Sequence, residues 1–141
     1  MELLHKLDNY KNYGLLFIRI ALGIMFMYHG FPKLMGGTVS WAQIGGAMSL
    51  LGISFLPAFW GFMAAAVEFF GGILFVAGFQ FRIVCALQAI NMVVATVFHF
   101  SNGDGLGGAA HAIEDCIIFI GLIFVGAGIY SVDNKLKPAV I

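Results

Sequence analysis

Residues 14–34 read GLLFIRIALGIMFMYHGFPKL, an apolar run that contains ionisable side chains at Arg19, His29 and Lys33. A helix needs about 20 predominantly apolar residues to cross a bilayer. Three further runs of this kind cover residues 55–78, 83–100 and 112–130. The sequence therefore predicts an all-α integral membrane four-helix bundle in a single domain spanning residues 1–141, with helices over roughly 14–34, 56–78, 82–100 and 111–130.

The composition supports a membrane protein and excludes a nucleic-acid-binding one. Hydrophobic residues make up 61% of the chain and charged residues only 10%, and the mean hydropathy is +0.97. Soluble domains carry about 25% charged residues. The formal charge is zero and there is no basic run, so no nucleic acid is expected as a partner. Membrane lipids are the expected surroundings.

The positive charges of the loops predict the orientation of the bundle. Five of them fall on one side together with both termini: Lys6, Lys11, Arg82, Lys135 and Lys137. Loops rich in lysine and arginine remain in the cytoplasm. We therefore expect a multi-pass protein of the bacterial inner membrane with both termini cytoplasmic, and an amphipathic lead-in over residues 1–13. Trp41 and Trp60 fall at the opposite interface.

Residues 36–54 are too polar and glycine-rich to span the membrane. An apolar stripe within them, formed by Ile44, Ala47, Met48 and Leu51, indicates a short interfacial helix between helices one and two. This helix could cover the outer mouth of the bundle, and a plain connecting segment is the alternative. Residues 101–110 are glycine-rich and are expected to form a flexible hairpin loop.

Two ionisable groups are expected near the middle of the membrane. Counted from the outer helix ends, Arg19 lies at a depth of about 22 Å and Glu68 at roughly 18 Å. A charge at the centre of a membrane helix is costly. We therefore expect a buried ion pair of Arg19 with Glu68, hydrogen-bonded by Asn91. The pair could serve only to hold helices one and two in register.

A second polar layer lies within about two turns of the outer surface. It comprises His29, Lys33, His99, His111 and Glu114. We expect these side chains to line one ligand-binding cavity, with a purely structural network as the alternative. Two histidines and a glutamate could hold zinc or iron, and two histidines could hold a haem, but the expected local spacings are absent and we assign no metal ligands. Cys85 and Cys116 differ in depth by roughly 20 Å, so no disulfide is expected.

A quinone suits such a pocket, because its carbonyl groups accept hydrogen bonds and its reduction consumes protons that histidine can supply. The chain has fifteen Phe and seven Met, which suit a ring and an apolar tail. No redox cofactor motif is encoded, so a quinone is the cofactor considered.

Three segments give the chain a resemblance to a known family. They are RIALGIMFMYHGFPKL, AAAVEFFGGILFVAGF with Arg82, and EDCIIFIGLIFVGAGIYSVD. Together they resemble the DoxX family of small four-helix membrane proteins. The resemblance implies a subunit of a membrane redox complex. The alternative is a non-enzymatic module that binds a lipid or a partner transmembrane helix. Whether the chain is itself an enzyme, and whether it forms a homo-oligomer, stay open.

Overall fold

The computed structural model describes residues 7–136, which are helical apart from short connections. The elements are η1 (Asp8–Tyr10), α2 (Lys11–Met35), α3 (Gly37–Gly45), η2 (Gly46–Leu51), α4 (Pro57–Ala77), α5 (Phe81–Ser101), α6 (Gly105–Val125) and α7 (Val132–Lys135). Within the described part, four helices are long and apolar enough to cross a membrane: α2 with its 3-10 lead-in, α4, α5 and α6. The predicted all-α membrane bundle is confirmed, and the short helix between helices one and two is present as α3 followed by η2.

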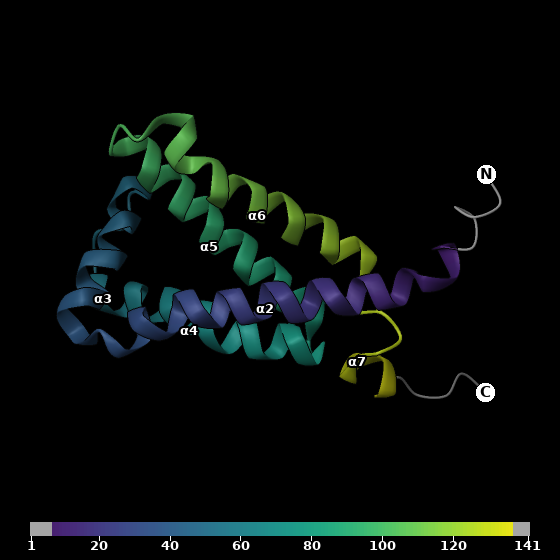
Figure 1. The fold of residues 1–141 in the computed structure, drawn as a ribbon. Helices are drawn as coiled ribbons and strands as arrows, with labels where there is room; N and C mark the ends of the chain where they lie inside the picture. The colour runs from purple at the N-terminus through teal and green to yellow at the C-terminus, as the bar shows by residue number, and fades with distance from the viewer. Residues whose placement is uncertain (1–6, 137–141) are drawn as a thin grey trace.

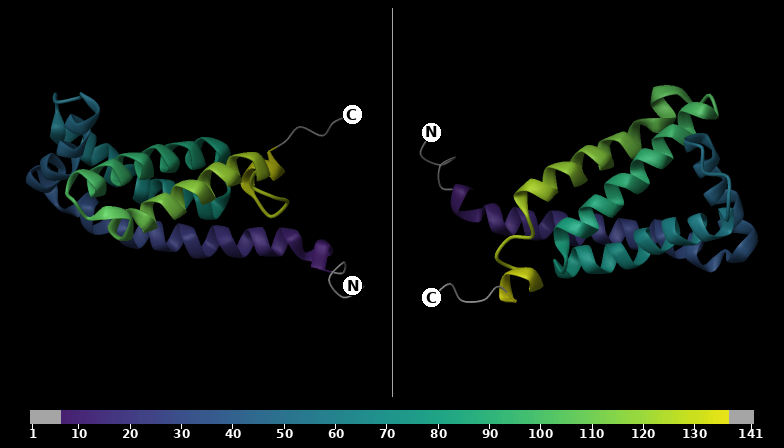
Figure 2. Two further views of the ribbon diagram at one scale, coloured as in Figure 1. Left: turned by 90° about the horizontal axis from the view of Figure 1, so that it is seen from above. Right: turned by 180° about the vertical axis from the view of Figure 1, so that it is seen from behind.

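The four long helices form two pairs that converge at one end of the bundle (Figure 1). Helix α2 runs beside α4, and α5 runs beside α6. The pairs meet at the end that carries η1 and α7, here called the terminal end. They spread apart toward the opposite end, where α3 and η2 lie between them (Figure 2). We call this the α3 end. A cavity lined by residues of α3, η2, α4 and α5 lies at this end.

Glycines allow α4 to pack against its neighbours at backbone distance. A Cβ atom added at Gly72 would lie 2.8 Å from the carbonyl oxygen of Gly23 in α2. One added at Gly30 would lie 2.8 Å from the Cβ of Glu68. On the other side, Gly61 meets the backbone of Trp41 in α3. Small residues permit such close helix contacts within membranes, and these contacts determine the register of α2 against α4.

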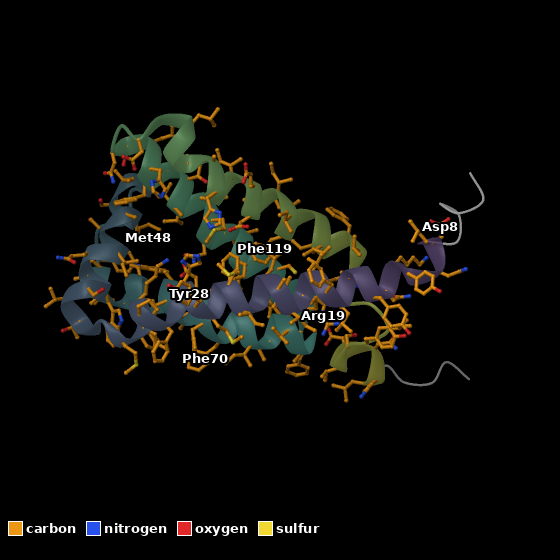
Figure 3. All side chains as sticks on the ribbon, in the orientation of Figure 1. Asp8, Arg19, Tyr28, Met48, Phe70 and Phe119 are labelled. Carbon is orange, nitrogen blue, oxygen red and sulfur yellow. The ribbon has the colours of Figure 1, made fainter. Side chains whose placement is uncertain are left out.

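Aromatic rings form the core between the two pairs. Phe119 of α6 lies edge-on to Phe26 of α2 at 4.9 Å and to Phe75 of α4 at 5.5 Å between ring centroids. Phe75 in turn stacks on Phe81 of α5 at 5.0 Å. Edge-to-face and offset-stacked rings at such distances attract one another beyond their burial. These rings therefore join all four long helices, with Phe119, labelled in Figure 3, at the centre of the contacts.

Helix four was predicted at 111–130 and instead covers Gly105–Val125. It begins earlier because Ala109 and Ala112 are buried in the core. The free energy gained by packing the glycine-rich segment as a helix exceeds the cost of glycine's low helix propensity. The hairpin loop is reduced to the few residues before Gly105. The helix ends earlier because Gly126 adopts a left-handed φ of +79°, which terminates it.

Helix one is also longer than predicted. It starts at Lys11 and continues through Pro32 to Met35. The predicted lead-in over residues 1–13 lies partly outside the described residues, which begin at residue 7. Its described part is η1 and the first turn of α2. The membrane-spanning helix therefore begins before residue 14, although this segment is polar.

Candidate functional site

A buried carboxylate, a lysine and an asparagine meet between three helices. Glu68 of α4 is only 4% exposed. Both of its oxygens accept hydrogen bonds from Lys33 Nζ of α2 at 2.7 Å, and Oε1 also accepts one from Asn91 Nδ2 of α5 at 3.1 Å. A buried charge requires such a counter-charge and hydrogen bonds. The predicted contact between Glu68 and Asn91 is confirmed, but the cation is Lys33 and not Arg19.

The predicted ion pair of Arg19 with Glu68 is wrong because of the register between α2 and α4. Gly30 lies directly against Glu68. Lys33 is one turn beyond Gly30, so its long side chain reaches the carboxylate. Arg19 lies about 16 Å before Gly30 along the helix axis. Depth counted along each helix separately could not detect this offset.

Arg19 instead binds backbone carbonyl groups at the terminal end (Figure 3). Its guanidinium donates to the carbonyl oxygens of Phe75 and Val76 near the end of α4 and to those of Ala127 and Tyr130 after α6. The ends of helices carry unpaired carbonyls and partial negative charge. A 1% exposed arginine is therefore stabilised by two helix C-termini at once, and its role is structural.

The segment after α6 closes the same end by capping α5. Asp133 accepts hydrogen bonds from the backbone N–H groups of Gln80 at 2.8 Å and Phe81 at 2.9 Å, while its own N–H donates to the carbonyl of Gly78 at 3.0 Å. Ser131 caps α7 by accepting from the N–H of Asn134. An acidic side chain at a helix N-terminus satisfies unpaired amides. These contacts stabilise the terminal end of the bundle.

A cavity of about 630 Å³ lies between α4 and α5 and is covered by α3 and η2. Its walls are mainly apolar. They include Ile44, Ala47, Met48, Phe59, Met63, Val67, Leu87, Ile90, Val94 and Phe98, and its polar lining residues include Lys33, Gln43, Glu68, Asn91 and His99. Pockets of a few hundred cubic ångströms with few polar groups are typical of small-molecule sites. The short helix covers one mouth of the bundle, as expected, and that this mouth faces outward stays a prediction.

Two polar residues that line the cavity, His99 and Trp60, differ in whether they have a hydrogen-bond partner. His99 Nδ1 lies 2.7 Å from a carboxylate oxygen of Asp104, and both side chains are more than a third exposed. The indole N–H of Trp60 is buried and has no hydrogen-bond partner among the described residues. A buried donor without a partner is unfavourable.

The remaining predicted site residues do not share this cavity. His29 of α2 and His111 of α6 are exposed neighbours with ring centroids 6.0 Å apart. Glu114 is exposed on α6. The expected single cavity of histidines and glutamate is wrong, because Lys33 and His99 line the α4–α5 cavity, whereas the other three side chains are exposed outside it. In the described chain, no group of three or more His, Cys, Asp or Glu could hold a metal ion.

Two buried polar residues were not singled out as site residues from the sequence. Asp115 is 6% exposed, and its Oδ2 lies 3.4 Å from His111 Nε2. Gln88 is 1% exposed and donates to the carbonyl of Val67. Nothing in the local pattern distinguished Asp115 from its neighbour Glu114, since only packing decides which of two adjacent positions faces inward. Both cysteines are free thiols.

Comparison with known proteins agrees with this architecture. The DoxX family matches residues 14–101. The chain belongs to the DoxX family. It is 28% identical over 138 residues to an uncharacterized protein of Haemophilus influenzae, covering 94% of this chain and 97% of that one. It is also 28% identical over 120 residues to the Bacillus subtilis protein named "Putative oxidoreductase CatD", covering 85% and 84%. No solved structure matches the chain.

Proposed function

We propose that this DoxX protein binds a quinone in the cavity between α4 and α5, as a membrane component of a redox complex. The observation that carries the proposal is the cavity itself, which combines apolar walls with the Lys33, Glu68 and Asn91 cluster. A related protein that carries the word oxidoreductase in its name supports the redox part. A lipid with a polar headgroup is the competing ligand.

The polar groups suit the head of a quinone. Lys33 Nζ and Asn91 Nδ2 belong to polar residues that line the cavity, and quinone carbonyl oxygens accept hydrogen bonds. Reduction of a quinone takes two electrons and two protons. The electrons come from a redox cofactor of a partner subunit, and the protons enter through Lys33 and His99. The protein thus provides binding and proton supply rather than electron storage.

We infer that an apolar tail leaves the cavity laterally, beside Leu87 and Ile90. Leu87 is 45% exposed and Ile90 is 62% exposed, and both line the cavity. They belong to a helix that is apolar enough to span the membrane, so these side chains face hydrocarbon. A ligand can enter from the bilayer without passing through water.

We further propose an inner-membrane location with both termini in the cytoplasm, so that the cavity lies in the outer half of the membrane. Lys11, Arg82 and Lys135 all belong to elements at the terminal end, as the positive-inside rule requires for a cytoplasmic face. Lys6 and Lys137 lie outside the described residues. Labelling of a cysteine introduced at Asp104 tests this topology: labelling only after permeabilisation would contradict it.

Tryptophan fluorescence provides a direct binding test. The two tryptophans of the chain lie at this site, Trp60 in the cavity wall and Trp41 donating to the carbonyl of Lys33. Decylubiquinone titrated into the protein in detergent micelles should quench their emission saturably. Ala95→Phe fills the cavity and should raise the decylubiquinone concentration that gives half-maximal quenching at least tenfold. Val93→Phe, on the 48% exposed outer side of α5, should leave that concentration unchanged.

Mass analysis of lipids extracted from the purified protein separates the two ligand classes. Co-purified quinone that is depleted by Ala95→Phe supports the redox role. Retention of phospholipid alone, with equal quenching of both variants, would reject the quinone site and favour a non-enzymatic lipid-binding module.

A further inference from the structure

The outward face of α6 carries an ionisable side chain where a lone bundle would meet lipid. Glu114 is exposed, and it lies about 14 Å from the start of a helix roughly 31 Å long. It makes no hydrogen bond or ion pair with the described residues. His111 and His29 are exposed beside it, on α6 and α2. Ionisable side chains inside a membrane face protein or a water-filled cavity, because hydrocarbon does not solvate them.

We propose that a second copy of this chain covers this face, with α6 packed against α6 about a two-fold axis. The name α6 patch is used here for His29, His111 and Glu114. It contains both hydrogen-bond donors and a carboxylate, so it is complementary to itself. Self-complementarity is what a two-fold interface requires. The contact lies on a different surface from the α4–α5 cavity and does not depend on the quinone proposal.

The geometry of α6 permits the approach. Gly107, Glu114 and Gly121 are exposed and recur every seven residues, which returns to nearly the same helix face. A Cβ atom at Gly107 or Gly121 would meet no other atom within 4 Å. The glycines therefore serve no contact within the described chain, unlike those between α2 and α4. On an exposed face they allow another helix to come close.

The spacing along α6 selects the polar partner. Glu114 lies three residues after His111, about 4.5 Å along the helix axis, and a glutamate side chain can span that distance. In a parallel pair of α6 helices, each Glu114 therefore reaches the partner copy's His111, and the contact occurs twice. Asp115 points inward and stays paired with His111 of its own chain.

Disulfide crosslinking in membranes tests the interface. In a chain carrying Cys85→Ala and Cys116→Ala, Gly121→Cys should give an oxidised dimer. Ile73→Cys is the matched control, since it lies at the same distance from the end of α4 and is 42% exposed. It should stay monomeric. Crosslinking at both positions alike, or at neither, would overturn the proposal, as would capture of a different protein at residue 121 without self-crosslinking.

Energy transfer between labelled copies in liposomes measures the affinity. Gly121→Leu should raise the dimer dissociation constant at least tenfold, whereas Gly14→Leu, at an equally open glycine of α2, should leave it unchanged. His111→Ala and Glu114→Ala should each weaken the dimer, and the double variant should be no weaker than either single one. Additive losses of dimer affinity for His111→Ala and Glu114→Ala would refute the contact. So would energy transfer between copies of Gly121→Leu that is as strong as between unaltered copies.

Discussion

The ion pair of Lys33 with Glu68 predicts an asymmetric loss of stability. Lys33→Met leaves a carboxylate that is 4% exposed with Asn91 as its one remaining donor. Breaking a buried pair in this way costs about 3–5 kcal/mol. Glu68→Gln instead leaves a lysine whose side chain is 40% exposed, so its ammonium can move toward water. We expect that change to cost about 1–3 kcal/mol, the range for an unsatisfied polar group.

The double variant of Lys33→Met with Glu68→Gln should recover part of the loss, because neither charge remains unpaired. Residues in direct contact show coupling energies of about 0.5–3 kcal/mol, and two contacts of 2.7 Å favour the upper part of that range. The free energy of unfolding in mixed detergent micelles, followed by circular dichroism, measures all three variants.

Arg19→Lys combined with Glu68→Gln is the matched control. Those two residues share no partner, so their losses should add within about 0.5 kcal/mol. Additive losses for the Lys33 and Glu68 pair, or coupling between Arg19 and Glu68, would refute the assignment of the counter-charge. A larger loss for Glu68→Gln than for Lys33→Met would refute the argument from exposure.

Three further predictions concern the terminal end, each measured as the change in unfolding free energy. Arg19→Lys should cost about 2–4 kcal/mol, because a lysine cannot donate to all four carbonyls and charged hydrogen bonds are worth about 1.5–3 kcal/mol each; an unchanged stability would contradict the structural role. Gly78→Ala should cost more than Gly103→Ala, since both have a left-handed φ but only a Cβ at Gly78 would lie 2.6 Å from Ser131 Cβ; equal losses would argue against close packing. Asp133→Ala should cost about 0.5–2 kcal/mol by removing the cap of α5, and a loss no larger than that of an exposed polar substitution would count against it.

Hydropathy alone was sufficient to predict the helices α4 and α5 nearly to their ends. Each is a long apolar run bounded by a turn residue, Pro57 before α4 and Gly78 after it. Asn91 and His99 of α5 were both predicted as site residues, and both line the cavity. These features depend on the chain's own chemistry and on the thickness of a bilayer.

Helix α6 was less predictable. Its first turns, Gly105–Gly108, contain residues of low helix propensity, and burial of Ala109 overrides that preference. Propensity is a weak guide where tertiary packing contributes more. The same packing determines that Asp115 is buried while Glu114 is exposed.

The sequence by itself determined that this is a four-helix membrane protein with costly polar groups inside its spans, because hydrophobic length and charge can be read from one chain segment at a time. Tertiary structure decided which groups meet. Glu68 pairs with Lys33 because Gly30 and Gly72 bring α2 and α4 together in one register. The same register places Arg19 away from Glu68, and its guanidinium donates to carbonyl groups near helix ends. Register arises from close contacts between distant residues, and no single segment contains that information.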